Sequence, residues 1–333
     1  MYAKMVLLMT MRHLATLVLI GCGLAGWAAS AFAQTPYPSK PIRVINPFPP
    51  GGSIDVVARP VFDRLRGPLG QPLVMDFRPG GGTLIGASIA AKSPPNGYTL
   101  YAAAGQHAII PSVYRKLPFD VMRDFAAVIN LATGPYLLVV HPSVPAKSVK
   151  ELLALAKASP GRLNFSSAGN GSGFHMAGEL LKLISKTDIA HIPYSGGAPA
   201  AIAVLSGEVD MTFGSPAVLL AHMKSGRVRA LAVSTLQRFA PLPEVPTMAE
   251  AGVPGFDAAS WYGLFAPGGT SREIIDRLVT EINVVLKGAE IRQIFEKFGL
   301  EPAGGTAEEF RTLFVQDMER WAKVAKSANV RVD

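Results

Sequence analysis

Short apolar runs alternate with longer amphipathic segments from Ile42 to the C-terminus, and this alternation constrains the fold more than any other feature. Several runs are continuously apolar, as expected for parallel strands that are buried on both faces. Strands that alternate with helices build α/β folds with mainly parallel sheets. The expected strands are residues 42–48, 73–77, 99–103, 137–141, 163–166, 189–193, 210–213, 229–234 and 261–265.

Capping signals mark where several helices begin. Ser148, Thr247, Thr270 and Thr306 each stand three residues before a glutamate. This spacing fits the capping box, in which the hydroxyl and the glutamate each bind a backbone N–H. Pro60 lies inside the helix expected from Ser53, so we expect that helix to kink or to begin late.

The α/β pattern continues for longer than one domain comfortably holds, which predicts two α/β lobes. No low-complexity linker interrupts it, so we expect strands to cross between the lobes and act as a hinge. Gly134-Pro135 and residues 254–260 are the candidate crossings. Residues 34–133 and 263–333 would form the first lobe, and residues 134–262 the second.

The N-terminus predicts export. The apolar residues 14–25 and the triplet Ala31-Phe32-Ala33 indicate a signal peptide over residues 1–33, cleaved after Ala33. The apolar run is shorter than the roughly 20 residues that span a bilayer, so we expect a soluble periplasmic protein. Residues 19–22 loosely resemble a lipoprotein box, and lipidation of Cys22 is the alternative.

Charge and cysteine content limit the possible partners. Cys22 is the single cysteine, so cleavage leaves a chain without disulfides. Removal of Lys4 and Arg12 with the signal peptide lowers the formal net charge from +8 to 8 − 2 = +6, a mild excess that suits anionic small ligands. Lysines and arginines are scattered singly, without a basic run or interleaved aromatic residues, and this excludes a nucleic-acid signature.

Gly- and Ser-rich stretches follow four of the expected strands. They are "PFPPGGSID" (residues 47–55), "RPGGGT" (78–83), "AAAGQH" (102–107) and "FSSAGNGSGFH" (165–175). In open α/β sheets, ligands bind beyond the carboxyl ends of strands, where helix N-termini present N–H groups. Backbone amides and short hydroxyls in such loops predict a site for a small anion.

Signatures for cofactors, metals and catalysis are missing. No phosphate-binding G-x-x-x-x-G-K-[ST] occurs, and Gly169, Gly171 and Gly173 lack the dinucleotide spacing. Neither a G-x-S-x-G elbow nor a histidine pair with metal-ligand spacing is present. Ser172 and His175 are one helical turn apart, as a hydrolase could use, but no orienting carboxylate is evident. We therefore expect no catalytic residue, no metal and no cofactor.

Several residues have a structural alternative to ligand contact. Asp55 either caps the helix that follows it or contacts ligand. His175 at a helix start is either a structural donor to the loop or a ligand contact. Tyr194, Phe213 and Trp261 lie at strand ends, where aromatic residues belong to the core or to a pocket.

The ordered motifs of the chain resemble those of one family. They include "YPSKPIRVINPFPPGGSID", "RPGGG", "PPNGYTL", "LNFSSAGNGSGFHMAGELLK", "HIPYSGGAPA", "LPEVPTMAEAGVPGF" and "SWYGLFAPGGT". Together they are similar to the Bug receptors, the extracytoplasmic solute-binding proteins of tripartite tricarboxylate transporters. The resemblance covers essentially the whole chain after residue 33.

The resemblance implies a type II periplasmic-binding-protein fold, with two α/β lobes around a cleft. It implies a monomer that captures a small organic carboxylate through backbone amides and waters and delivers it to a membrane permease, without catalysis. The implied contacts from the first lobe are Phe48, Gly51, Gly52, Ser53, Asp55, Gly105, Gln106 and His107. Those from the second lobe are Ser167, Ala168, Gly169, Gly171, Ser172, His175, Tyr194 and Phe213.

Some positions depart from the family pattern. Gly214 stands where the family often has an aspartate, which puts an amino-acid ligand in doubt because no partner for an ammonium remains there. Phe77 and Ile110 stand where asparagine is common, which favours an uncharged or aromatic tail on the ligand. A sensor subunit for a membrane signalling partner is the alternative function, and an exported hydrolase is a second alternative.

Overall fold

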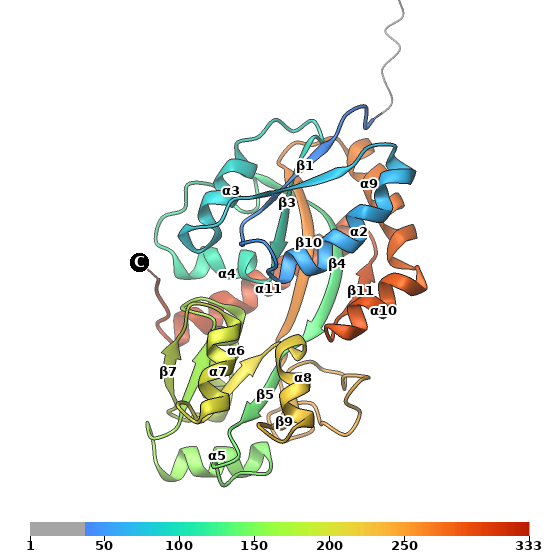
Figure 1. Ribbon diagram of the computed structural model, residues 1–333. Helices are drawn as coiled ribbons and strands as arrows, with labels where there is room; N and C mark the ends of the chain where they lie inside the picture. Colours follow the sequence, from blue (N-terminus) through green and yellow to red (C-terminus); the bar gives the residue numbers. More distant parts are fainter. Residues whose placement is uncertain (1–36, 333) are drawn as a thin grey trace, which may run out of the picture. The chain divides into compact units, whose positions relative to one another are not determined.

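The computed structural model describes residues 37–332, and Lys40–Asp333 form one compact unit built on two β-sheets (Figure 1). The predicted signal peptide and Cys22 lie outside the described residues. The six-stranded sheet has the order β11-β4-β10-β3-β1-β2. Its strands are β1 (Ile42–Asn46), β2 (Leu73–Phe77), β3 (Thr99–Ala104), β4 (Phe125–Pro135), β10 (Ala259–Pro267) and β11 (Glu301–Gly304).

The five-stranded sheet has the order β7-β6-β8-β5-β9. Its strands are β5 (Leu137–Val140), β6 (Asn164–Ser167), β7 (Ala190–Pro193), β8 (Met211–Gly214) and β9 (Arg229–Val233). The helices are α2 (Ser53–Leu69), α3 (Leu84–Ala91), α4 (Gln106–Val113), α5 (Val149–Ala158), α6 (Gly173–Ser185), α7 (Gly197–Ser206), α8 (Pro216–Lys224), α9 (Arg272–Leu286), α10 (Ala289–Lys297) and α11 (Ala307–Ser327), with the short 3₁₀ helix Gly81–Thr83 before α3. The prediction of an α/β chain with two sheets is confirmed.

Parallel pairing brings loops together at one edge of each sheet. β1 pairs in parallel with both β2 and β3. In the other sheet, β6 pairs in parallel with both β7 and β8. The carboxyl ends of neighbouring parallel strands lie at the same edge of a sheet. The loops after β1, β2 and β3 therefore share one edge, and those after β6, β7 and β8 share another.

The chain passes between the sheets twice. It leaves the six-stranded sheet after Pro135 and enters β5 at Leu137, and it returns at Ala259, where β10 begins. Ser234 ties the two passages together, because its Oγ accepts the Tyr136 N–H at 2.8 Å and donates to the Ala258 carbonyl. The expected crossings therefore contain or adjoin the observed ones.

Each expected strand corresponds to an observed strand with slightly different ends, but β4 and β11 were not expected. β4 is buried along nearly its whole length and so shows no alternation of polarity. Its sequence also includes Asn130 and Gly134, residue types that are depleted in strands. β11 contains Pro302, which is tolerated because β11 lies at the edge of the sheet.

Two of the four predicted capping residues cap a helix. Ser148 accepts the Glu151 N–H, and Thr306 forms a reciprocal capping box with Glu309. The prediction for Thr270 is wrong by one residue, because Ser271 caps α9 while Thr270 binds the Pro267 carbonyl. Thr247 makes the expected bonds with Glu250, but they close a turn rather than a helix.

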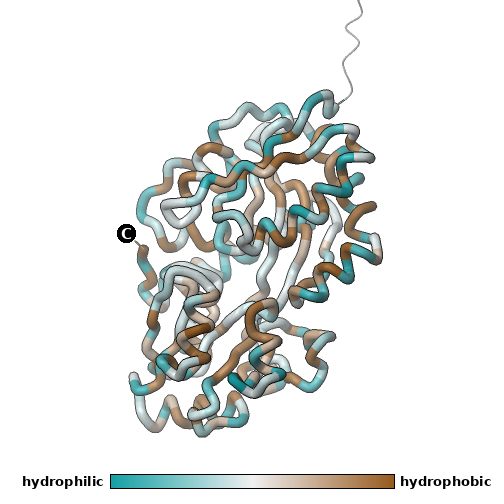
Figure 2. Tube along the Cα trace, in the orientation of Figure 1, coloured by the Kyte–Doolittle hydropathy of each residue, from teal (hydrophilic) through white to brown (hydrophobic). Residues whose placement is uncertain are grey.

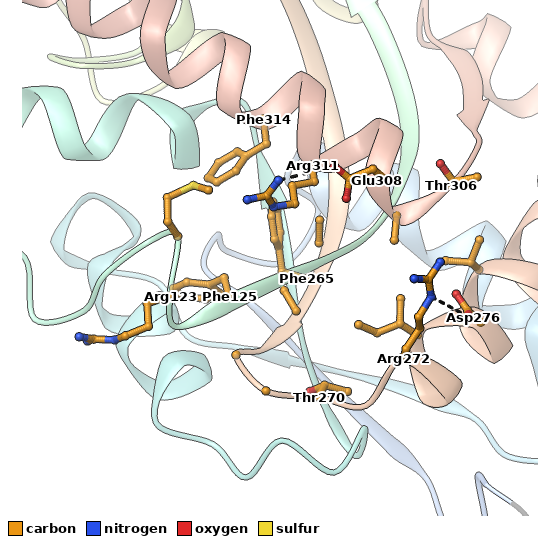
Figure 3. Close-up of a pocket in the computed structure, with 18 of the residues that line it drawn as sticks. Arg123, Phe125, Phe265, Thr270, Arg272, Asp276, Thr306, Glu308, Arg311 and Phe314 are labelled. Carbon is orange, nitrogen blue, oxygen red and sulfur yellow. Dashed lines mark ion pairs between the residues drawn. The ribbon is translucent and has the colours of Figure 1, made fainter.

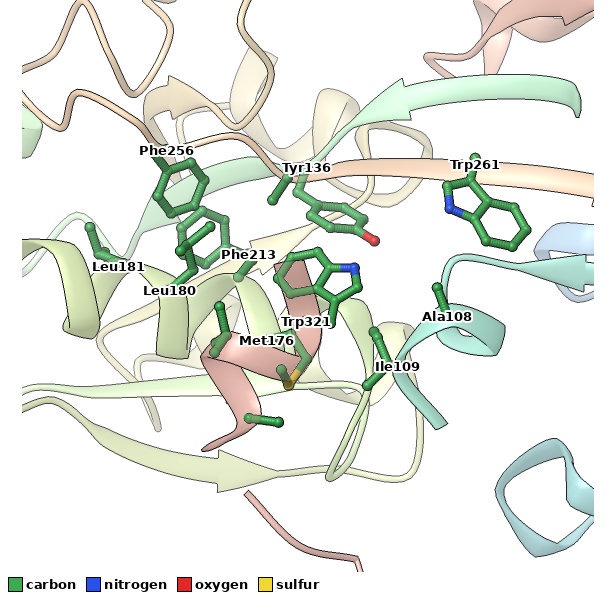
Figure 4. Close-up of a cluster of buried hydrophobic side chains, with 14 of the residues drawn as sticks. Ala108, Ile109, Tyr136, Met176, Leu180, Leu181, Phe213, Phe256, Trp261 and Trp321 are labelled. Carbon is green, nitrogen blue, oxygen red and sulfur yellow. The ribbon is translucent and has the colours of Figure 1, made fainter. Parts of the chain in front are cut away.

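α2 begins at Ser53 despite Pro60 in its interior, so the expected late start is wrong. Figure 2 shows hydrophilic and hydrophobic residues alternating along the outer helices, as expected for helices with one buried face. One cluster of buried side chains includes residues from both sheets, and Figure 4 shows part of it around Tyr136, Phe213, Trp261 and Trp321.

Candidate functional site

Three loops meet at one edge of the six-stranded sheet, after β1, β2 and β3. The first two pack closely, because a Cβ added to Gly86 would lie 3.0 Å from Pro47 Cβ and 3.1 Å from the Arg78 carbonyl oxygen. Gln106 Nε2 donates to the Gly82 carbonyl at 3.4 Å and so joins the third loop to the second. The predicted site segments 48–55 and 105–107 thus lie at one edge.

The first turn of α2 lacks a side-chain cap. Gly52 is its N-cap residue, and the first intrahelical bond is donated by Val56 to the Gly52 carbonyl. Ser53 and Ile54 therefore present backbone N–H groups that have no acceptor among residues 37–332. Such groups, together with the helix dipole, favour an anion.

Asp55 holds the loop before α2. Its carboxylate is buried, accepts the Gly51 N–H at 2.9 Å and pairs with Arg59 at 2.7 Å. Gly51 needs this support because its φ of 77° lies in the left-handed region. The two contacts favour the structural role for Asp55, although it fixes the loop instead of capping the helix.

Of the four helices that begin away from the loop edges, α10 starts after Gly288 without a side-chain cap and the other three are capped. Ser148, Ser271 and Thr306 accept N–H groups in the first turns of α5, α9 and α11. By contrast, α4 and α7 start after Gly105 and Gly196 without a side-chain cap. Open helix starts are therefore frequent at the two loop edges, where a ligand could replace the missing cap.

The loop before α6 is organised by its own side chains. Ser172 caps α6 by accepting the His175 N–H at 3.2 Å. His175 Nδ1 accepts the Gly171 N–H at 3.1 Å, and Ser167 Oγ accepts the Gly169 N–H at 3.2 Å. The amides of Gly169 and Gly171, both among the predicted contacts, are thus used inside the loop.

The start of α6 still offers donors. The N–H groups of Gly173 and Phe174, in its first turn, have no acceptor in the described part of the chain. Ala168 lies in the same loop and is half-buried. These amides, rather than those of the two glycines, are the ones available to an anion.

A row of hydroxyls, which the sequence analysis missed, connects α2 with α6. The Tyr136 hydroxyl oxygen would lie 2.2 Å from a Cβ at Gly173. The Ser260 hydroxyl interacts with those of Tyr136 and Tyr262, and Tyr262 also interacts with Ser53. Burial raises the pKa of both tyrosines, so the phenols stay protonated and can donate hydrogen bonds. Only the position of Tyr136 next to the predicted crossing Gly134-Pro135 could have indicated this role.

Three predicted contacts have side chains engaged elsewhere. The His107 ring lies among Tyr101, Phe119, Phe125, Phe265 and Phe314 in the core. Phe213 is fully buried and stacks on Phe256 with 5.6 Å between ring centroids. The half-buried Tyr194 donates its hydroxyl to Glu208 at 2.8 Å. Trp261, also considered, is buried and bonded to Asp317.

A pocket of about 600 Å³ lies elsewhere, between the start of β4 and helices α9 and α11 (Figure 3). Phe125, Phe265 and Phe314 line it, and three arginines stand at its rim. Each arginine is paired with an acid: Arg123 with Asp124, Arg272 with Asp276 and Arg311 with Glu308. None of the predicted contacts lines this pocket.

Within residues 37–332, no group of three or more histidine, cysteine, aspartate or glutamate side chains is arranged to hold a metal ion. No helix in this range has the length and apolar character needed to cross a membrane.

Comparison with known proteins identifies the same family as the sequence motifs. The family model described as tripartite tricarboxylate transporter family receptor matches residues 57–330. Protein BugT of Bordetella pertussis is 36% identical over 326 residues, which cover 97% of this chain and 100% of BugT. The family model covers most of the chain, and the BugT match covers nearly all of it.

Solved structures share the fold. R. palustris Rpa4515 with adipate superposes with a TM-score of 0.79 at 36% identity, covering 89% of this chain and 99% of that one. MatC from Rhodopseudomonas palustris with bound malate gives a TM-score of 0.76 at 29% identity, covering 86% and 99%. The predicted type II periplasmic-binding-protein fold is confirmed by this likeness.

Proposed function

Because the chain belongs to the tripartite tricarboxylate transporter receptor family, we propose that it captures a small organic carboxylate between its two loop edges and delivers it to a membrane permease. The observation that carries the proposal is the uncapped start of α2, where Ser53 and Ile54 present free N–H groups. The Gly173 and Phe174 N–H groups in the first turn of α6 supply the second set of donors. The two related structures that hold adipate and malate support a carboxylate as ligand.

Amide and hydroxyl donors suit reversible capture. A carboxylate at a helix N-terminus forms charge-assisted hydrogen bonds, which are stronger than neutral ones. The hydroxyl row adds donors at Ser53 and Tyr262, and no lysine or arginine is among the proposed contacts. The affinity for the carboxylate should therefore be moderate, which helps its release to a permease.

Ligand capture requires the loop edges to approach each other. We place the lobe boundaries slightly outside the expected ones, at the observed passages, with residues 37–135 and 259–332 in one lobe and residues 136–258 in the other. Tyr136 and Ser234 lie at the hinge. A ligand that binds the closed arrangement better shifts the population toward it. Phe48, Gly52, Ser53, Gly105 and Gln106 would act from the first lobe.

The Ser172 and His175 pair in the loop before α6 is not arranged as a catalytic nucleophile and base. Ser172 Oγ is engaged with the His175 backbone N–H, and the Nδ1 atom of the same histidine is engaged with Gly171. Ser172 is therefore not activated by the histidine ring. We propose a receptor without enzymatic activity, exported to the periplasm and acting as a monomer.

The ligand is expected to lack an ammonium group. β8 ends at Gly214 and Ser215-Pro216 follows, so none of these three residues offers a carboxylate to an ammonium group. A sensor that reports occupancy to a membrane signalling partner would use the same site. Co-purification from cross-linked membranes separates the two, because a permease and a sensor are different partners.

A thermal-shift screen tests the proposal. A ligand that binds only the folded chain stabilises it by about 2.7 kcal/mol at a hundredfold excess over Kd. This stabilisation raises the melting temperature. The panel is adipate, malate, tricarboxylates, aromatic acids and amino acids. A shift with one acid class supports the receptor. Binding of amino acids alone would contradict the expected ligand class, and turnover of any acid would contradict a receptor.

A further inference from the structure

Two histidine rings stack next to the loop of residues 167–171. The ring centroids of His175 (α6) and His191 (β7) lie 3.8 Å apart, with 13° between the planes. The Phe165 ring lies 4.9 Å from that of His191 and extends the packing. His175 is buried and His191 is half-buried, and the stacked rings restrict each other's rotation, so the nitrogen atoms of both histidines have fixed positions.

Each ring holds one part of the loop. His191 Nε2 lies 2.6 Å from Ser167 Oγ, which also accepts the Gly169 N–H at 3.2 Å. His175 Nδ1 accepts the Gly171 N–H at 3.1 Å. The two glycines have φ values of 113° and 71°, so the turn needs external bonds to keep its left-handed backbone. Both ends of the turn therefore depend on an imidazole nitrogen.

The surroundings define the protonation of the stack. Because His175 Nδ1 accepts a hydrogen bond, the ring proton of the neutral form is on Nε2. That atom lies 3.7 Å from Glu179 Oε1, and Lys182 Nζ binds the same oxygen at 2.9 Å. A carboxylate that faces the second nitrogen of an imidazole fixes its tautomer. Glu179 thus keeps Nδ1 free to accept.

Burial and the neighbouring His175 lower the pKa of His191 to about 3. Its ring is therefore neutral at physiological pH and can share a proton with Ser167 in either direction. A charged His191 would face a second imidazole in a half-buried place, which is unfavourable.

We propose that His175 and His191 are positioning residues, whose stack holds residues 167–171 so that the first-turn amides of α6 point at the ligand carboxylate. This inference rests on the proposed function of the site. Neither ring is a ligand contact in this arrangement. His191 was not among the predicted residues, and His175 acts through Gly171.

Matched substitutions separate the hydrogen bonds from the packing. His175→Asn places an amide oxygen near the position of Nδ1, and His175→Phe keeps a ring without the acceptor. His191→Gln and His191→Phe make the same comparison for Nε2. His222→Phe on α8 is the control for adding a phenyl ring elsewhere. Circular dichroism confirms that each variant is folded.

The first readout needs no ligand. NMR hydrogen exchange reports the protection of the Gly169 and Gly171 amides in the unliganded protein. We expect His175→Phe to lower protection at Gly171, and His191→Phe at Gly169, by about tenfold, as for loss of one net hydrogen bond. The Asn and Gln variants should stay near wild type. Wild-type protection in both Phe variants, or equal losses in the Phe and amide variants, would overturn the proposal.

The second readout is calorimetric binding of adipate. Both Phe variants should bind about tenfold more weakly than wild type, while the Asn, Gln and control variants retain affinity. Unchanged affinity in the Phe variants would refute the positioning role even if the exchange rates change. Failure of the wild-type protein to bind adipate or any other acid refutes the proposed function instead, and hydrogen exchange then decides the role of the stack alone.

Discussion

Trp261 donates its indole N–H to Asp317 Oδ2 at 2.7 Å, and this bond joins β10 to α11 inside the core. Asp317 is 3% exposed, and Arg320 Nη1 lies 3.3 Å from its other oxygen. Burial raises the pKa of this carboxyl. The Trp261 carbonyl also accepts the Gly105 N–H at 3.1 Å, so the same residue supports the loop at the start of α4.

Trp261→Phe should lower the free energy of unfolding by about 2–4 kcal/mol, because it removes a donor from a buried carboxylate as well as packing. Urea denaturation measures the loss. Asp317→Asn keeps an acceptor for the indole and should cost less. In the Asp317→Asn background, Trp261→Phe should cost less than in wild type; an equal cost in both backgrounds would assign the loss to packing alone.

Gly173→Ala should disturb the start of α6. A Cβ at this position would lie 2.2 Å from the Tyr136 hydroxyl oxygen, so either the tyrosine or the helix must move. We expect the free energy of unfolding to fall by about 1–3 kcal/mol, as for overpacking of a buried site. Gly67→Ala in α2 is the matched control, because apart from its chain neighbours and the surrounding helix backbone no atom lies within 4 Å of the added Cβ. Thermal unfolding of both variants makes the comparison, and equal stability would contradict the close contact.

The sequence was sufficient to predict the α/β class, most strands and the loops at their ends, because apolar runs and Gly-rich stretches are local signals. It was not sufficient for β4, which is held by antiparallel pairing with β10, more than a hundred residues away in the chain. A fully buried strand with small residues carries no local pattern of its own.

In the candidate site, too, local sequence signals could be predicted and contacts that depend on the fold could not. Gly- and Ser-rich composition indicated the loop of residues 167–172, but it could not tell which amides are free. That depends on Ser167 and His175, whose partners come from the fold. His107 shows the opposite case, since a histidine next to a predicted anion loop turns its ring into the core. Side-chain direction follows tertiary packing that no short motif records.

Ser53→Asp should prevent carboxylate binding. Ser53 is exposed in the first turn of α2, where its amide has no acceptor among the described residues, so a carboxylate there would repel an anionic ligand and occupy its donors. We expect at least about a hundredfold loss of affinity for the acid found in the screen, measured by calorimetry, as for 3 kcal/mol. Ser271→Asp at the N-cap of α9 makes the same change away from the loops and should retain affinity. Equal affinity in both variants would place the ligand elsewhere.

His107→Leu should make the protein more resistant to acid. Burial lowers the pKa of His107 from 6.5 to about 3, and both ring nitrogens lack a partner among the described residues. The folded pKa is below the unfolded one, so acid protonates the unfolded chain first. The neutral His107 ring therefore costs the folded protein nothing above about pH 6.5. Below that pH the free energy of unfolding falls by about 1.4 kcal/mol per pH unit, down to about pH 3. Wild type should therefore lose about 2 kcal/mol through this residue between pH 7.5 and pH 5.

Leucine does not titrate and leaves no unpaired nitrogen, so His107→Leu should show a smaller fall in the free energy of unfolding over that interval. At pH 7.5 the variant should lose at most about 1 kcal/mol of stability relative to wild type, since an unsatisfied polar group is replaced by an apolar one of similar size. Urea denaturation at the two pH values gives the difference. Gln106→Leu, at the preceding position of α4, is the control and should keep the wild-type pH dependence. If wild type and His107→Leu lose the same stability between pH 7.5 and pH 5, the His107 ring is charged or hydrated in the folded protein, and the aromatic cluster around it is not closed to water.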